Sequence, residues 1–246
     1  MTELPDAIPV LVNGRWWLTL PEHRAVRPHW LIENGGWETE RLAAIHDAIT
    51  PGMVVFDVGA EEGDFSALFT LWGAQVVLFE PNPRVFPNIR FIWEANNLPA
   101  PLGYFCGFAC NQTNLKPKHI ERIFKQKDIN GWPACAYGPV IGDHGFRNVC
   151  ERPHDTPQTR IDDYVTRTGI IPELITMDVE GAELEVLRGA EQTLRDNRIP
   201  VFVSIHPAFI EEMYGDTEDD VHAFMESLGY EGEHLATDHE DHWVFT

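Results

Sequence analysis

Acidic residues and glycines at the ends of two apolar runs carry the first chemical signal. The run 53–58 is apolar apart from Asp57, and it is followed by Gly59, Gly63 and a helical apolar pattern. The two glycines let the backbone approach a ligand closely and are expected to leave free N–H groups at the N-terminus of a helix, where a carboxylate or a phosphate is favoured. The next apolar run ends at Glu80, near the spacing at which a strand-end carboxylate meets ribose hydroxyls. The sequence therefore predicts a nucleotide-like ligand here.

The type of ligand follows from the spacing and from Asp57. The glycines are arranged as Asp-x-Gly-x-x-x-Gly, which differs from the Gly-x-Gly-x-x-Gly of dinucleotide enzymes. A carboxylate beside the bound group suits an ammonium better than a pyrophosphate. This combination is similar to the S-adenosylmethionine site of class I methyltransferases, whose ligand has an amino acid at one end and a ribose at the other. A tight turn alone would explain the glycines, but it would not explain Glu80.

A second set of polar residues follows two later apolar runs. Asp178 and Glu180 come at the end of the run 174–179, and His206 follows the run 201–205. Ligands of open α/β sheets bind at the carboxyl ends of strands, so these three side chains are expected in the same crevice. His206 suits proton transfer near neutral pH, with Asp178 or Glu180 serving directly or orienting it. The three could instead hold a divalent cation, or Glu180 could simply favour the start of its helix.

Alternating apolar runs and helical patterns predict an α/β fold with a doubly wound, mostly parallel sheet. Before that sheet, Asn13-Gly14 between apolar runs predicts a hairpin. Residues 1–50 are expected to form an N-terminal hairpin and helical appendage, and residues 51–246 the main domain. Other expected elements are helices over 38–49 and 182–195, a third strand over 102–109, and final strands over 230–235 and 242–245.

The segment 110–157 is long for a connection inside a compact domain. Such a segment is usually a functional lid or a disordered insert, and its aromatic residues favour a lid over the substrate. These aromatic residues are Trp132, Tyr137 and Phe146. All the lysines of the chain lie in the same segment, in an amphipathic pattern, at positions 116, 118, 125 and 127. They form either a solvated basic face or a docking patch for an anionic part of the substrate.

Composition bounds the class of protein. The hydrophobic content of 43% is ordinary for a globular chain of 246 residues. A formal net charge of −21 argues against a nucleic-acid partner, because binding a phosphate backbone needs a basic face.

No apolar stretch is long enough to cross a bilayer and no secretory leader is found, so a cytoplasmic location is expected. The cysteines include no C-x-x-C pair and are expected to be reduced. Oligomeric state is not predicted.

Three histidines near the end of the chain, His234, His239 and His242, are a further candidate metal set. Their spacing does not match a closed metal signature, which favours a solvated turn.

Four sequence blocks together resemble the FkbM-type S-adenosylmethionine-dependent methyltransferases. They are 56–63, with Asp57, Gly59, Ala60 and Gly63; 79–83, with Glu80 and Pro81; 159–164; and 177–190, with Asp178, Glu180 and Gly181, which is the most characteristic. The similarity extends roughly over residues 37 to 206. Members usually carry Asn where Glu61 stands and Lys where Thr176 stands.

The resemblance implies a Rossmann-like seven-stranded sheet with a reversed last strand and helices on both faces. It implies methyl transfer to an oxygen, typically a hydroxyl of a sugar, a nucleotide sugar or a polyketide. In this interpretation residues 59–63, with Ala60 and Glu61, hold the methionine end of the cofactor. Glu80 and Pro81 bind the ribose, and Phe108 either stacks on the adenine or lies in the core. A divalent cation is not favoured.

Two other function classes stay open. The same fold could bind S-adenosylmethionine or another nucleoside without catalysis, as a sensor or an assembly partner. An NAD-dependent oxidoreductase is a weaker alternative, disfavoured by the glycine spacing and by Asp57.

Overall fold

A seven-stranded sheet forms the centre of the computed structural model, which describes residues 6–31, 33, 35–124, 131–141 and 156–246. The strand order is β10-β11-β9-β8-β3-β4-β5, and all pairs are parallel except the two that include β11. This order confirms the predicted doubly wound sheet with a reversed last strand. The strands are β3 (Val54–Val58), β4 (Gln75–Phe79), β5 (Gly103–Phe105), β8 (Leu174–Asp178), β9 (Val201–Ile205), β10 (Gly232–Thr237) and β11 (Asp241–Phe245).

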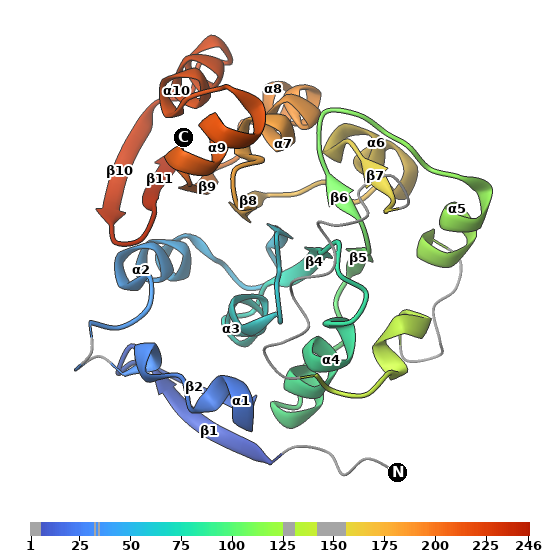
Figure 1. Ribbon diagram of the computed structural model, residues 1–246, viewed down its shortest axis with the longest axis vertical. Coiled ribbons are helices and arrows are strands. Elements are labelled where there is room, and N and C mark those ends of the chain that lie inside the picture. The colour runs from blue at the N-terminus through green and yellow to red at the C-terminus, as the bar shows by residue number, and fades with distance from the viewer. Residues whose placement is uncertain (1–5, 32, 34, 125–130, 142–155) are drawn as a thin grey trace.

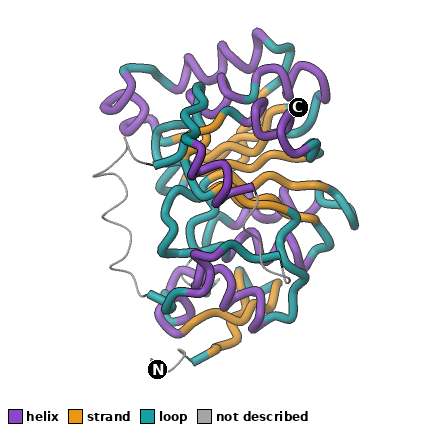
Figure 2. The backbone as a smooth tube through the Cα atoms, turned by 90° about the vertical axis from the view of Figure 1, so that its right-hand side faces the viewer, coloured by secondary structure: helices purple, strands orange, loops and turns teal. Residues whose placement is uncertain are grey.

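Helices cover both faces of the sheet (Figures 1 and 2). Successive strand residues point to opposite faces, so Val55 belongs to one hydrophobic core and Phe56 to the other. The first core is closed by α2 (Thr39–Ala48), α3 (Asp64–Leu71) and α4 (Phe86–Ala95). The second is closed by α6 (Ile161–Thr168), α7 (Glu183–Gly189), α8 (Glu191–Asn197), α9 (Pro207–Tyr214) and α10 (Glu218–Ser227). Among the described helices, none is long and apolar enough to cross a membrane.

Two expected elements are interrupted in the structure, and a glycine stands at each break. The expected strand over 102–109 ends after Phe105, and β6 (Phe108–Ala109) pairs instead with β7 (Gln158–Thr159) outside the central sheet. At Gly107 a Cβ atom would lie 2.4 Å from the Pro157 carbonyl oxygen. The expected helix over 182–195 is two helices, because α7 ends at Gly189, packed against the Cys110 carbonyl.

The N-terminal hairpin shares a hydrophobic core with the sheet. It consists of β1 (Ala7–Val12) and β2 (Trp16–Pro21), joined through Asn13 and Gly14 in left-handed conformations, as that pair predicts. Leu18 and Leu20 are buried in the same core as α3 and α4. The Asn96 side chain donates to the Thr19 carbonyl and accepts from the Thr19 N–H, both at 2.8 Å. The hairpin is therefore fixed against the main domain.

Part of the segment 110–157 is described. It contains α5 (Pro117–Phe124) and the 3₁₀ turn η3 (Ala134–Tyr137). Trp132 is buried against Trp93. Tyr137 is exposed, and its ring centroid lies 4.1 Å from Cζ of the Arg90 guanidinium. Phe146 and two of the four lysines lie outside the described residues. The lid over the substrate remains a prediction.

A buried arginine joins the N-terminal segment to the turn after β3. Arg24, from the short helix α1 (Glu22–Ala25), donates to both Glu61 carboxylate oxygens, at 3.2 and 3.0 Å, and to Asp64. Only 4% of the Arg24 side chain is exposed. Its neighbour His23 lies 2.7 Å from the buried Glu62. The turn that was predicted to bind a ligand is thus held by the appendage.

We predict that Arg24→Ala lowers the free energy of unfolding by about 3–5 kcal/mol, because it leaves buried acids without their counter-charge. Urea denaturation followed by fluorescence measures this change. The exposed Arg167→Ala on α6 removes the same charge and should change stability by less than about 0.5 kcal/mol. Equal effects of the two substitutions would contradict the role of Arg24.

Candidate active site

The carboxyl ends of four strands meet at one edge of the sheet. In the parallel register, Asp57 of β3 lies opposite Thr176 of β8, and Asp178 lies opposite Ser204 of β9. Gly59, Glu80 and His206 follow the ends of β3, β4 and β9 at the same edge. β11 runs in the opposite direction, with Asp241 opposite Ile205, so its beginning also lies here. The structure therefore brings the two predicted groups of polar residues to one edge.

The turn after β3 depends on a glycine. Gly59 has φ of 88°, and a Cβ atom there would lie 1.8 Å from the Asp178 carbonyl oxygen. Its N–H and that of Ala60 both donate to the Phe79 carbonyl, and the Gly63 N–H donates to the Ala60 carbonyl. The expectation that the glycine N–H groups are free for a ligand is therefore wrong. The turn closes on strand β4, and Gly59 serves close packing between strand ends.

Glu80 links the two strand ends. Its carboxylate accepts the N–H of Glu61 at 3.0 Å and the N–H of Asn82 at 2.7 Å. Each bond uses one carboxylate oxygen, so further lone pairs remain to accept donors. Burial raises the pKa of Glu80 to about 8, and the charge of Glu61 adds to this effect. Pro81, the next residue, is half-buried beside it.

Asp57 is buried below the turn. Its carboxylate accepts a hydrogen bond from the Ser66 hydroxyl of α3. Burial raises the pKa of Asp57 to about 6, against the lowering effects of that bond and of the Arg41 charge. Asp57 thus lies at the predicted place, with α3 as its partner.

The two positions that depart from the family pattern both contact arginines. Glu61, left-handed with φ of 48°, has a side chain 48% exposed that turns to Arg24. Thr176 is buried, and its hydroxyl accepts from Arg41 of α2 at 2.8 Å. The Arg41 guanidinium also pairs with Glu38 and lies 3.9 Å from Asp178. A cation therefore stands beside Asp178, although it comes from a different element than the pattern suggests.

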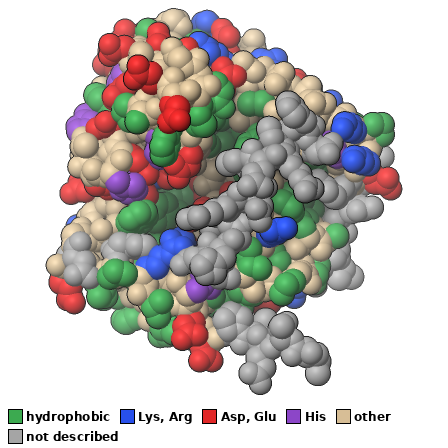
Figure 3. Space-filling model, in the orientation of Figure 1, with side chains coloured by type: hydrophobic (Ala, Val, Ile, Leu, Met, Phe, Trp, Pro, Cys, Tyr) green, Lys and Arg blue, Asp and Glu red, His purple; other side chains and the backbone are tan. Residues whose placement is uncertain are grey.

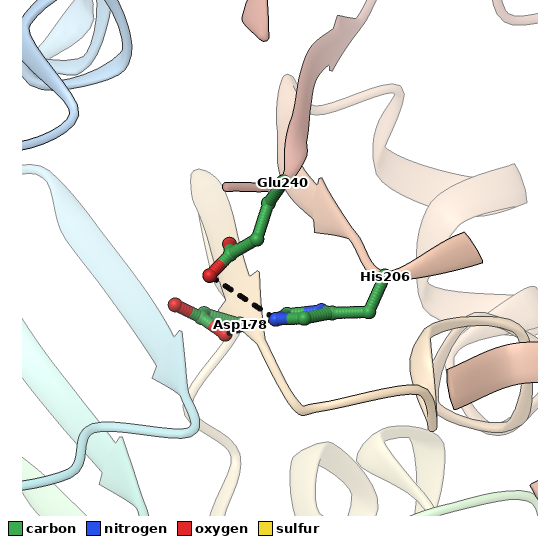
Figure 4. Close-up of side chains that lie close together, drawn as sticks. All are labelled: Asp178, His206 and Glu240. Carbon is green, nitrogen blue, oxygen red and sulfur yellow. Dashed lines mark ion pairs between the residues drawn. The ribbon is translucent and has the colours of Figure 1, made fainter. Parts of the chain in front are cut away.

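His206 lies at the centre of a cluster of four carboxylates. Its Nδ1 is 2.8 Å from Glu183, and its Nε2 is 3.1 Å from Glu240. Asp178 and Glu180 are 3.6 and 3.5 Å from the same Nε2. Figure 4 shows the imidazole reaching from β9 toward the carboxylates of Asp178 and Glu240. Asp178, Glu180 and His206 are thus brought together, but Glu180 is 71% exposed at the rim.

These carboxylates change the protonation of the cluster. Burial lowers the pKa of His206, but the hydrogen bond with Glu183 and the charges of Glu240 and Asp178 outweigh it and raise the pKa to about 11. Burial and the charge of Glu240 raise the pKa of Asp178 well above its usual range. His206 is therefore the counter-charge of the surrounding acids.

Sequence reasoning missed Glu240, Glu183 and Arg41. The acid at position 183 was visible in the 177–190 block, and Glu240 precedes the last strand, which the reversed topology places beside His206.

The expected solvated turn of histidines is wrong for His242, which is buried, with its Nδ1 3.0 Å from the Ser204 hydroxyl. His239 instead stacks on Trp37.

Phe108, the candidate for adenine stacking, belongs to β6. It is only half-buried and pairs with Gln158, outside the central sheet. Its place beside an adenine remains a prediction.

Comparisons with known proteins show which family and which fold the chain is similar to. The family described as the methyltransferase FkbM domain matches residues 57–231. The hexuronic acid methyltransferase AglP of Haloferax volcanii is 24% identical over 188 residues, which cover 74% of this chain and 68% of AglP. The crystal structure of methyltransferase FkbM from Methylobacillus flagellatus KT aligns with a TM-score of 0.51 and 16% identity. That alignment covers 79% of this chain and 44% of the other, so the chain spans under half of that structure, and the likeness concerns the fold alone.

Because the pKa of Glu80 is raised in the folded protein, the free energy of unfolding should depend on pH. The folded protein holds a proton on Glu80 up to about pH 8, whereas the unfolded chain releases it near its usual pKa. This contribution to stability is fully present below the unfolded pKa and is lost as the pH rises through the folded one. Between pH 5 and 8 we expect a loss on the order of a few kcal/mol, which Glu80→Gln should remove.

Denaturant unfolding at several pH values measures this slope. Glu226→Gln, an exposed acid on α10, is the matched control and should keep the slope of the unsubstituted protein. If Glu80→Gln kept the full slope as well, Glu80 would not be the group that titrates.

Proposed function

Because the chain belongs to the FkbM methyltransferase family, we propose that it is an S-adenosylmethionine-dependent enzyme that methylates a hydroxyl group of a sugar. The family match over residues 57–231 supports methyl transfer with this cofactor. The observation that carries the proposal is the meeting of the Glu80 turn with the Asp178–His206 cluster at one edge of the sheet.

The residues at the first strand ends fit this cofactor. The buried Glu80 carboxylate has lone pairs left after its two backbone bonds, as needed to accept ribose hydroxyls. Asp57 and Glu61 provide acidic groups for the ammonium of the methionine end. In this proposal Ala60 and Gly63 shape the turn, and Pro81 borders the ribose.

The chain's own part in the transfer is to position the acceptor and to remove its proton. S-adenosylmethionine would supply a methyl group on a sulfonium, and an aligned acceptor oxygen would bond to that methyl carbon as the carbon–sulfur bond breaks and S-adenosylhomocysteine leaves. Asp178 offers a partly exposed carboxylate to the hydroxyl proton. His206 holds that carboxylate in place, and Glu180 stands at the rim, where an acceptor would enter.

A sugar acid is the first acceptor to test. The relative AglP is a hexuronic acid methyltransferase, and a hexuronic acid is an anion. Lys116 and Lys118 are exposed at α5 and could attract such an acceptor to an otherwise acidic surface. Nucleotide sugars and polyketide alcohols complete the panel.

We predict that Glu80→Gln weakens S-adenosylmethionine binding by about 10- to 100-fold, because an amide nitrogen, which only donates, replaces one of the two oxygens that accept hydrogen bonds there. Isothermal titration calorimetry measures this, with Glu226→Gln as the control that should bind normally. Unchanged affinity in Glu80→Gln would remove Glu80 from the cofactor site.

We also predict that His206→Asn lowers the transfer step by about 10²- to 10⁴-fold while barely changing cofactor affinity, because Asp178, the proposed proton acceptor, loses the cation that holds it in place. Single-turnover assays with isotope-labelled S-adenosylmethionine, followed by mass spectrometry of the acceptor, measure this step. Full transfer by the variant would place the chemistry elsewhere. Tight cofactor binding without transfer to any acceptor of the panel would favour a non-catalytic binding protein.

A further inference from the structure

We propose that Asp178, His206 and Glu240 form a binding site for a divalent metal ion. One ligand atom of each lies within 4.8 Å of the other two. His206 Nε2 is 3.1 Å from Glu240 and 3.6 Å from Asp178 (Figure 4). Adjacent ligands of an octahedral ion with bonds of about 2.1 Å are about 3 Å apart. Small side-chain movements would therefore complete the site.

The imidazole is held in the orientation that a metal ligand needs. Nδ1 lies 2.8 Å from the Glu183 carboxylate, which is fully buried and also accepts the Gly181 N–H at 3.0 Å. A carboxylate can only accept, so Nδ1 is the protonated nitrogen of this bond and Nε2 faces the other acids. A histidine whose second nitrogen donates to a carboxylate is the usual arrangement around protein metals.

Three buried polar atoms of the cluster have no hydrogen-bond partner among the described residues. They are His206 Nε2, Glu240 Oε2 and Glu183 Oε2, in side chains that are 7%, 6% and 0% exposed. Nε2 is near Glu240 Oε1 but not in hydrogen-bond geometry with it. Buried polar atoms without partners are costly, so the unpartnered Nε2, which faces Glu240 and Asp178, points to a ligand at this place.

The charge of the cluster also favours a divalent cation. Four carboxylates lie within 3.6 Å of one imidazole, and Arg41 is the guanidinium beside Asp178. Acidic side chains therefore outnumber the cationic ones, and an ion bound at His206 Nε2 would replace the proton that this nitrogen otherwise carries. His239 is near Glu240 too, but it is 44% exposed and screened by water. Acidic side chains also gather on the visible surface over α10 and the β10–β11 pair (Figures 1 and 3).

The donor set indicates which class of ion binds. One imidazole and two carboxylates suit a first-row divalent ion such as Mn²⁺ better than Ca²⁺, which prefers oxygen ligands alone. Three protein ligands leave coordination positions open for an acceptor oxygen. A cation there would lower the pKa of a hydroxyl, a role that rests on the proposed function. The site differs from the set expected from the sequence, because Glu240 replaces the exposed Glu180.

Mn²⁺ titration of the full-length, chelator-treated protein tests the site. We expect electron paramagnetic resonance to show one tight Mn²⁺ per chain, with an electron spin-echo signal from a coordinated nitrogen. Glu240→Gln should weaken this binding by at least about 10-fold, and His206→Asn should abolish the nitrogen signal. Glu233→Gln, an exposed acid on the neighbouring strand β10, makes the same change in net charge and should bind Mn²⁺ normally.

Equal Mn²⁺ affinity in Glu240→Gln and Glu233→Gln, or a bound Mn²⁺ without nitrogen coupling, would overturn the proposal. Circular dichroism confirms that each variant is folded, and Asp178→Asn provides a second variant of the site with the same expected loss. Calorimetric binding of S-adenosylmethionine is measured separately on the same samples. If S-adenosylmethionine did not bind, the proposed function would be refuted, but the Mn²⁺ measurement would still decide whether the metal site exists.

Discussion

The packing of Gly59 against the Asp178 carbonyl is the constraint on which the crevice depends. A side chain at residue 59 would collide with that oxygen, and φ of 88° is itself a conformation that favours glycine. Because β3 and β8 are neighbours, this contact holds the turn 59–63 directly against the acidic end of β8. In the proposed function, the backbone would therefore set the distance between a cofactor on the turn and an acceptor near Asp178.

Buried charge is the second constraint, and the N-terminal segment supplies what it needs. The strand ends collect Asp57, Glu80 and Asp178, each of which has a raised pKa because of burial. Arg24 and Arg41 reach this edge from elements that precede the family match at residue 57. Both are buried and each contacts more than one acid. The appendage is thus part of the electrostatics of the crevice, beyond its role in covering the sheet.

The sequence predicted the sheet and the strand-end residues because both depend on local patterns. Apolar runs, glycines and the acids at their ends lie close together in the chain, so Asp57, Glu80 and Asp178 could be placed on one edge from topology. Arg41 could not, because its contact with Thr176 joins residues more than thirty positions apart, and Glu240 was missed although the reversed last strand begins beside His206. The break after Phe105 was also missed, since it depends on Gly107 meeting Pro157 from a distant segment. Long-range packing, rather than local preference, decided each of these cases.

A crystal structure of the protein with S-adenosylhomocysteine would test the central claim, that the cofactor lies across these strand ends, most directly. We expect its ribose hydroxyls within hydrogen-bond distance of the Glu80 carboxylate and its sulfur directed toward Asp178 and His206. A nucleoside bound away from Glu80, or a sulfur directed away from the Asp178–His206 cluster, would contradict this assignment of the crevice.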